Sequence, residues 1–178
     1  MLKRLFDIIY RFITPMEVQA KKAGVAVGSN NFISSHFWGT EPYLISIGNN
    51  CQITGGVKMF THGGGQVLRD SIPDFDAFGK IVIGDYVYIG NNSLIMPGVT
   101  IGDHVLVAAG SVVSKSIPSG VVVAGNPARY VCSIEEYKSK NIKYNLNTKH
   151  LNKDDKKKIL QCTDDNLFIK KEFLRIEK

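Results

Sequence analysis

Acid–base chemistry in this chain of 178 residues depends first on its histidines. The sequence contains four, namely His36, His62, His104 and His150. His62 differs from the others because three glycines (63–65) follow it, and then a long stretch rich in Gly, Asp and Pro. An imidazole at the base of a flexible segment is well placed to act as a general base. A histidine that only completes a turn hydrogen bond is the alternative, and the spacing alone leaves both interpretations open.

The other three histidines give weaker indications. His104 occupies an outward turn position and His150 lies in the C-terminal tail, so we expect both to be solvated. His36 stands in an aromatic stretch that includes Trp38, where a packing role and a contact with substrate fit equally well. His62 is therefore the candidate base, and His36 and Trp38 are candidate substrate contacts.

An apolar residue recurs at every sixth position from Ile83 to Val113, and the fifth position of each unit is small or β-branched. An α-helix of 3.6 residues per turn cannot keep this register, and a simple strand alternates every two residues. Short strands joined by sharp turns, three per coil, do fit, and such units stack into a solenoid. The sequence therefore predicts a mainly β protein, a parallel β-helix with triangular coils.

The same register appears upstream, in units that begin at Ile47, Ile53 and Met59. Residues 63–80 carry no repeat, and we expect them to form an excursion loop thrown out from one coil. Long irregular loops on a regular scaffold are often functional. Arg69 and Asp70 on this loop are therefore candidate substrate contacts, although charged loop residues are usually only solvated.

These patterns divide the chain into an N-terminal helix (1–23), a β-helix of about five coils (24–132) and a helical C-terminal extension (133–178). Its content of 44% apolar residues suits one core. The N-terminal segment has apolar residues at helical spacing, and Pro15 should bend or end its first helix. We expect this segment to cap the open end of the solenoid, with an amphipathic helix on a membrane surface as the alternative.

The C-terminal extension is expected to contain helices at 134–144 and 150–162, with Asn152 as an N-cap residue. The formal net charge of +6 is concentrated in the two terminal parts. Basic surfaces attract nucleic acids or anionic lipids. The extension mixes both signs of charge and lacks the aromatic interleaving of single-strand binders, so no nucleic-acid partner is expected. Peripheral membrane contact remains open.

Two features bear on where the protein resides. No apolar run approaches the length that spans a bilayer. Three cysteines cannot all pair, and Cys51 falls on an inward position of a repeat, so nothing requires an oxidising compartment. We therefore expect a cytoplasmic protein.

Two long segments carry a resemblance to a known family. The segment IGNNCQITGGVKMFTHGGG resembles the catalytic coil of the hexapeptide-repeat acyltransferases, which are left-handed β-helices. The block from Ile83 to Arg129, which ends in IPSGVVVAGNPAR, resembles their acetyl-CoA-binding coils. The likeness covers roughly residues 24–132 and is closest to the maltose, galactoside and surface-polysaccharide O-acetyltransferases. The sequence GTEPYLISIG followed by THGGG looks closest to the branch that acetylates exported glycans.

This resemblance implies an acetyl-CoA-dependent O-acetyltransferase that acts on a carbohydrate hydroxyl in surface polysaccharide biosynthesis (capsule or O-antigen). It also implies a homotrimer with active sites between subunits, and it gives His62 the role of base. The family's acetyl-CoA contacts map onto Tyr88, Asn91, Ala109, Ser114, Lys115 and Arg129. Lys115 and Arg129 also make independent sense as cations for the phosphates of the co-substrate.

The chain departs from the family pattern at two positions. The residue after the histidine is often acidic in relatives but is Gly63 here, so another group must fix the imidazole tautomer. Allowing for two inserted residues, Glu41 falls about one coil from His62, and stacked coils lie about 4.8 Å apart. We therefore predict that Glu41 orients His62. The second departure is Tyr88, where sugar acetyltransferases often have Trp.

Two other functions remain as alternatives. An N-acetyltransferase acting on a nucleotide-linked amino sugar would use the same histidine, although such enzymes often carry an additional nucleotide-binding domain. A non-catalytic β-helix scaffold would not need His62 or the two cations. A zinc carbonic anhydrase needs three converging histidines, which the spacing of His36, His62 and His104 does not provide, so no metal is expected.

Overall fold

The structure, a computed structural model, describes residues 13–173 and 176. The chain divides into two compact units, residues 1–134 and residues 135–178. The predicted N-terminal helix at 1–23 lies partly outside the described residues.

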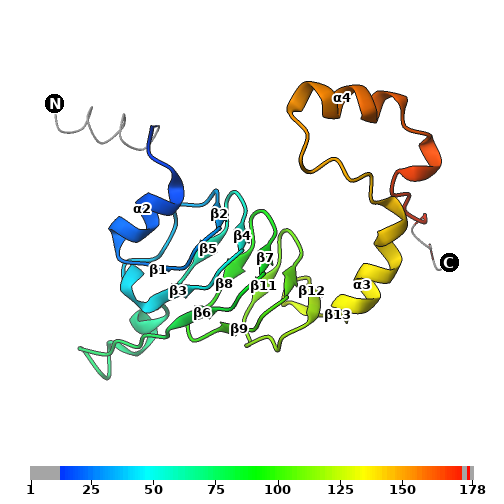
Figure 1. Cartoon of the computed structure of the whole chain (residues 1–178). Coiled ribbons are helices and arrows are strands. Elements are labelled where there is room, and N and C mark those ends of the chain that lie inside the picture. Colours follow the sequence, from blue (N-terminus) through cyan, green and yellow to red (C-terminus); the bar gives the residue numbers. More distant parts are fainter. Residues whose placement is uncertain (1–12, 174–175, 177–178) are drawn as a thin grey trace. The chain divides into compact units, whose positions relative to one another are not determined.

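The first unit consists mainly of short strands in three sheets (Figure 1). Sheet A contains β1 (Ala26–Val27), β3 (Ile45–Ile47), β6 (Ile81–Ile83) and β9 (Thr100–Ile101). Sheet B contains β2 (Phe32–Ile33), β4 (Gln52–Ile53), β7 (Tyr88–Ile89), β10 (Leu106–Val107), β12 (Val121–Ala124) and β13 (Arg129–Ser133). Sheet C contains β5 (Lys58–Met59), β8 (Leu94–Ile95) and β11 (Val112–Val113).

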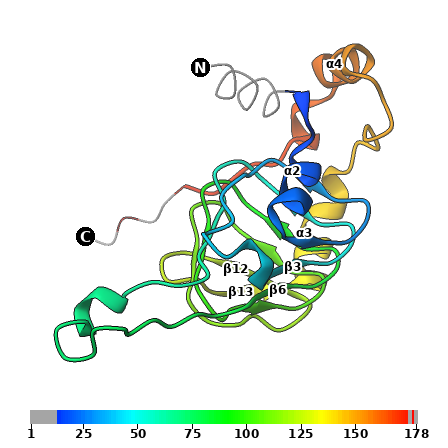
Figure 2. The ribbon, with the colours of Figure 1, turned by 90° about the vertical axis from the view of Figure 1, so that its left-hand side faces the viewer.

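Successive strands from β6 to β11 belong to sheets A, B, C, A, B and C in turn, and their pairing is parallel. The chain therefore winds as a parallel β-helix, and the prediction of a mainly β protein with parallel sheets is confirmed. Figure 2, which looks along the stack, shows the coils superposed. The last strand, β13, pairs with β12 in the antiparallel sense and ends the parallel stacking.

The six-residue period follows from the interior of these coils. First-position side chains from Ile83 to Val113 are all buried, as are all fifth-position side chains from Val87 to Ile117. Burying one such isoleucine or valine stabilises the fold by about 1.5–3 kcal/mol. The two buried serines at fifth positions satisfy their hydroxyls locally; Ser93, for example, donates to the carbonyl of Gly90 at 2.8 Å.

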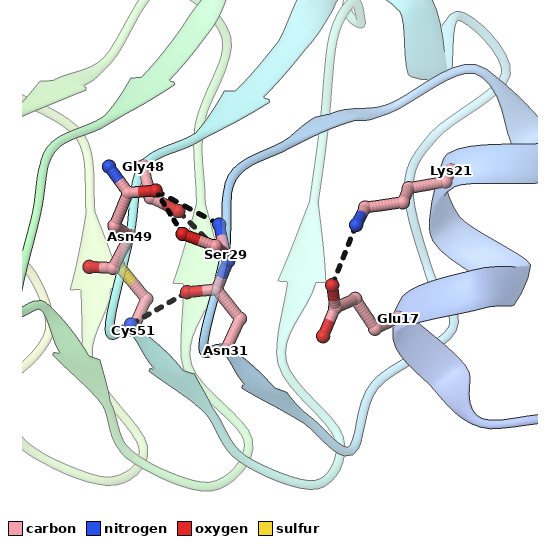
Figure 3. Close-up of polar contacts among 7 residues, drawn as sticks. All are labelled: Glu17, Lys21, Ser29, Asn31, Gly48, Asn49 and Cys51. Atoms are coloured by element: carbon pink, nitrogen blue, oxygen red, sulfur yellow. Dashed lines mark hydrogen bonds and ion pairs between the residues drawn. The ribbon is translucent and has the colours of Figure 1, made fainter.

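Each coil turns at three corners, which we name by the sheets they join. The A–B corner comprises residues 48–51, 84–87 and 102–105; the B–C corner comprises 54–57, 90–93 and 108–111; the C–A corner comprises 60–63, 96–99 and 114–117. Polar side chains link one coil to the next at the A–B corner. In Figure 3 the Asn49 Oδ1 atom accepts from both the amide and the hydroxyl of Ser29, each at 2.9 Å.

Between β5 and β6 the chain forms no strand, and its regular structure there is the short 3₁₀ helix η2 (Gly65–Leu68). In both ribbon views this segment extends away from the coils (Figures 1 and 2). Its two ends are held together, because His62 and Phe78 form an isolated antiparallel bridge and the Gly79 amide donates to the Thr61 carbonyl at 2.8 Å.

Helix α2 (Met16–Ala23) follows Pro15 directly, as the prediction of a helix break at Pro15 requires. Its Ala20 is fully buried, and the helix contacts β1, β2 and the 3₁₀ helix η1 (Pro42–Leu44) at the first coil. Its outer surface carries an ion pair of 2.8 Å between Lys21 and Glu17 (Figure 3). In the part of the chain that is described, no helix has both the length and the apolarity to cross a membrane.

The second unit contains helix α4 (Lys153–Cys162) and the 3₁₀ helices η3 (Ile142–Tyr144) and η4 (Asp165–Leu167), and helix α3 (Ile134–Asn141) leads into it. The prediction of Asn152 as an N-cap is confirmed, since its Oδ1 accepts from the amides of Asp154 and Asp155 at 3.0 and 2.9 Å. The helix predicted from residue 150 therefore begins three residues later, because the capping side chain fixes where helical hydrogen bonding starts.

Candidate active site

His62 lies at the C–A corner, just after β5 and just before the segment that leaves the coils. Its side chain is 40% exposed, and its ring packs at 5.5 Å against that of Phe78. A surface cavity of about 490 Å³ opens beside it. The cavity is lined by Phe60, His62, Gly63, Gly64, Leu94, Met96 and Pro97. A partly exposed imidazole thus faces an apolar cavity on the outside of sheet C.

Glu41 comes from the preceding coil at the same corner and reaches His62 directly. Its Oε2 atom lies 2.8 Å from His62 Nδ1. Two hydroxyl groups also bind this carboxylate: Thr61 donates to Oε2 at 2.6 Å and Thr40 donates to Oε1 at 2.7 Å. The structure therefore brings Glu41 and His62 together, and it adds two threonines that the sequence reasoning did not identify.

Hydrogen bonds to its charged form hold the pKa of Glu41 far below the usual range. The hydroxyl of Thr61 has the largest effect, that of Thr40 follows, partial desolvation opposes them, and His62 adds a further lowering, so that the pKa is about 2. An ionised carboxylate is an acceptor only. Nδ1 of His62 must therefore carry the hydrogen of the 2.8 Å contact, which leaves Nε2 of the neutral ring with a free lone pair.

A second cavity, of about 390 Å³, lies between the last turn of this corner and the strands β12 and β13 that end the stack. It is lined by Ser114, Lys115, Ser116, Ile117, Pro118, Val121, Val123, Ala128, Arg129 and Tyr130. Ser114, Lys115 and Arg129 are thus together, and both cations are exposed. Because Lys115 stacks two coils from His62 at this corner, the two positions are separated by about 10 Å along the helix axis.

Three other predicted co-substrate contacts lie elsewhere on the same chain. Asn91 and Ala109 occupy the B–C corner, where they stack in neighbouring coils and the Gly110 amide donates to the Asn91 carbonyl at 2.8 Å. Tyr88 projects from β7 of sheet B and is partly exposed. None of the three lines either cavity at the C–A corner.

The candidate substrate contacts differ in their exposure to solvent. Trp38 is only 6% exposed and belongs to the hydrophobic core, so its interpretation as a substrate contact is corrected: the indole packs inside the first coils instead of facing solvent. His36 is exposed. Arg69 and Asp70 lie on the exposed segment, where the Arg69 Nε donates to the Phe75 carbonyl at 3.2 Å.

The remaining histidine at a corner, His104, is exposed as expected and stacks on Tyr86, with ring centroids 4.9 Å apart. Across residues 13–173 and 176, no group of three or more His, Cys, Asp or Glu side chains is placed to hold a metal ion.

Sequence reasoning missed Thr40, Thr61 and Phe78. A register count could have found Thr61, because it immediately precedes His62 and faces the turn of the preceding coil that carries Glu41. The ring contact of Phe78 depends on how the excursion returns, which no repeat encodes.

Comparison with known proteins adds independent findings. The family model described as bacterial transferase hexapeptide (six repeats) matches residues 80–115. Protein CapG of Staphylococcus aureus is 48% identical over 145 residues, which are 79% of this chain and 84% of that protein.

Two solved structures are similar as well. A hexapeptide-repeat-containing acetyltransferase from Vibrio cholerae has a TM-score of 0.56 at 33% identity, and the match covers 62% of this chain and 63% of that one. A galactoside acetyltransferase in complex with coenzyme A has a TM-score of 0.52 at 28% identity, with 69% and 72% covered. The chain therefore spans most of CapG but less than two thirds of the Vibrio protein.

Proposed function

This chain belongs to the bacterial hexapeptide-repeat transferase family, and from this premise we propose that it is an acetyl-CoA-dependent O-acetyltransferase acting on a carbohydrate hydroxyl. One observation carries the proposal: the Glu41–His62 pair, with Nδ1 and Oε2 at 2.8 Å, stands at the mouth of the apolar cavity. The acetyltransferase names of its relatives and the coenzyme A bound to one of them support the choice of acetyl-CoA.

The chemistry that we propose needs no acyl-enzyme. Nε2 of His62 takes the proton of an acceptor hydroxyl while that oxygen attacks the thioester carbonyl of acetyl-CoA. The tetrahedral intermediate collapses, the C–S bond breaks, and the imidazolium returns its proton to the leaving thiolate. Glu41 holds the ring in the tautomer that leaves Nε2 free and stabilises the imidazolium that forms.

We propose that Ser114, Lys115 and Arg129 bind the phosphate-bearing end of acetyl-CoA. Ammonium and guanidinium groups are the usual protein partners of phosphate. The separation of about 10 Å along the helix axis between this cavity and His62 is one that the pantetheine arm of acetyl-CoA can bridge. The apolar lining of the cavity beside His62 suits that arm and the acetyl group.

The remaining co-substrate contacts, Tyr88, Asn91 and Ala109, suggest an oligomer. They lie on sheet B and at the B–C corner of the chain, away from its own C–A cavities. We propose a homotrimer in which these residues of one subunit complete the site formed by His62 of the next. In this arrangement residues 63–80 are an excursion loop that reaches a neighbouring subunit.

The finer features of the fold are part of the same proposal: a left-handed helix of about five coils at 24–132, an N-terminal helix at 1–23 and a helical extension at 133–178. The acceptor that we propose is a surface polysaccharide or its precursor, with His36, Arg69 and Asp70 as candidate contacts. We place the reaction in the cytoplasm. The basic terminal parts of the chain are the surfaces that would make any peripheral contact with a membrane.

The test is release of free thiol from acetyl-CoA over a panel of mono- and oligosaccharides. We expect acceptor-dependent release by the intact chain and none by His62→Ala. The matched control is His150→Ala, which removes an exposed histidine from the second unit and should leave the rate unchanged. Release that persists in His62→Ala would contradict the proposed mechanism.

A further inference from the structure

The carboxylate of Glu41 is held on both of its oxygen atoms. Thr40 donates to Oε1 at 2.7 Å, and Thr61 donates to Oε2 at 2.6 Å on the atom that also accepts from His62. The side chain of Glu41 is only 16% exposed. One hydroxyl on each oxygen prevents the carboxylate from rotating, whereas a single contact with the imidazole would leave that rotation free.

We propose that Thr61, assisted by Thr40, is a positioning residue for acyl transfer, because its hydroxyl clamps Glu41 in the orientation that aligns the His62 ring. The inference rests on the proposed function, since it assigns a supporting role to residues around the proposed base. Neither threonine lines the cavities at the C–A corner, and Thr61 acts through Glu41. Thr40 also lies 3.3 Å from His62 Nδ1, so its hydroxyl contacts both the carboxylate and the ring.

The position of Thr61 is itself tightly constrained. The residue is 1% exposed, and β-branching restricts its χ1 angle. Gly39, with φ of +65°, lies against it: a Cβ atom on Gly39 would be 2.8 Å from the Thr61 hydroxyl oxygen. The absence of a side chain at Gly39 therefore makes room for this hydroxyl beside the turn that carries Glu41.

Thr61 also connects the pair to the excursion. Its carbonyl accepts from the Gly79 amide at 2.8 Å, where the chain returns to the coils. The neighbouring Phe78 packs on the His62 ring. Thr61 thus fixes one side of the imidazole through Glu41, while the returning chain that it binds covers another side.

Packing alone does not explain a threonine here. A valine has almost the same shape and volume, and it would avoid the cost of burying a hydroxyl. The buried hydroxyl of Thr61 is compensated because its acceptor is charged, and such hydrogen bonds are the stronger ones. The polar atom therefore serves the carboxylate, not the core.

The test compares Thr61→Val, which removes the hydroxyl at constant volume, with Thr61→Ser, which retains it. Thr40→Val provides a second removal at an exposed position where folding is not at risk. Four quantities are measured for each variant: kcat and KM for acetyl transfer, the titration of Glu41 by carboxyl ¹³C NMR, and the tautomer of His62 by ¹⁵N NMR. Glu41→Gln and His62→Ala identify the two resonances.

We expect Thr61→Val to lower kcat about ten-fold with little change in KM, because the interaction lost does not touch either substrate. The pKa of Glu41 should rise from about 2, since the Thr61 hydroxyl is the main cause of its lowering. Thr61→Ser should restore both quantities, and Thr40→Val should shift both in the same direction by less.

The inference would be overturned if Thr61→Val kept the wild-type titration of Glu41, the wild-type tautomer of His62 and the wild-type kcat. A purely structural role would lower the stability of both Thr61 variants without separating Val from Ser. If the intact chain transfers no acetyl group but Thr61→Val still raises the pKa of Glu41, the clamp stands and the proposed function fails. The two failures are therefore distinguishable.

Discussion

Replacing Glu41 with Gln changes the chemistry at His62 without changing the size of the side chain. Three donors converge on the wild-type carboxylate: Thr61 at 2.6 Å, Thr40 at 2.7 Å and His62 Nδ1 at 2.8 Å. An amide offers one oxygen acceptor, and its nitrogen is a donor only. Whichever way the amide lies, its NH₂ group occupies the place of one carboxylate oxygen and faces a donor.

The two orientations of the amide have different consequences. With the NH₂ group at the Oε2 position, the Thr61 hydroxyl can rotate and accept a hydrogen bond instead of donating one. His62 can accept from the NH₂ group only through an unprotonated Nδ1, so the ring hydrogen moves to Nε2. That tautomer has no lone pair at Nε2 for the acceptor hydroxyl. With the NH₂ group at the Oε1 position the productive tautomer survives, without the negative charge that stabilises the imidazolium.

A positioned general base contributes about 10²–10⁴-fold to a rate. Because Glu41→Gln removes the productive tautomer or its charge stabilisation, we expect kcat to fall about 100-fold, with the loss in His62→Ala as the upper limit. KM for acetyl-CoA should change little, since Glu41 lines neither cavity. The assay is thiol release at saturating acetyl-CoA, and Glu135→Gln, at an exposed position of α3, is the matched control.

The double variant Glu41→Gln/His62→Ala sharpens the test. If Glu41 acts only through His62, the double variant is no slower than His62→Ala alone, because residues that work as a unit are not additive. Wild-type kcat in Glu41→Gln, or losses that multiply in the double variant, would refute the reasoning.

Three further predictions concern the rest of the structure. The pKa of Glu41 is lowered from 4.5 to about 2, so the stability that its ionised form contributes is complete above pH 4.5 and is lost as the pH falls through about 2. The free energies of unfolding of wild type and Glu41→Gln, measured by urea denaturation, should therefore converge over that interval. Ile95→Ala removes a fully buried side chain and should lower the free energy of unfolding by about 2–5 kcal/mol at fixed protein concentration. The control Gln52→Ala, on an outer face, should lower it by less than about 0.5 kcal/mol. Lys115→Ala should raise KM for acetyl-CoA about ten-fold with kcat nearly unchanged, and Lys149→Ala should change neither; a lowered kcat with a wild-type KM would contradict a phosphate-binding role.

The coils could be predicted from the sequence because a single physical requirement repeats along them. Each unit must place its first and fifth side chains inside, so Ile95 and Val99 carry the same information as Ile101 and Val105. The predicted start of α4 lies three residues too early, because helical hydrogen bonding begins only after the Asn152 cap, which the sequence did indicate. Trp38 was misread because the early coils are irregular and leave its direction undetermined.

The site was predictable only where it follows the register. Counting residues to the same corner of the preceding coil indicates Glu41, because stacked corners lie about 4.8 Å apart. Thr61 follows the same count but carries no distinctive signal, since a threonine before a turn is common for local reasons. Phe78 is out of reach of any count, because it lies within the eighteen residues (63–80) that carry no repeat and their path depends on contacts within the excursion.

The absence of an acidic residue after His62 has a structural counterpart in the cavity. Gly63 lines the cavity, and a Cβ atom at this position would meet no other atom within 4 Å. A carboxylate there would extend into the cavity beside the imidazole. Glu41 reaches Nδ1 from the preceding coil, on the side of the ring away from Nε2, and so supplies the orienting carboxylate without filling the cavity. Space at Gly63 and a carboxylate at Glu41 therefore belong to one arrangement, in which the ring is held from the coil side and left open toward the cavity.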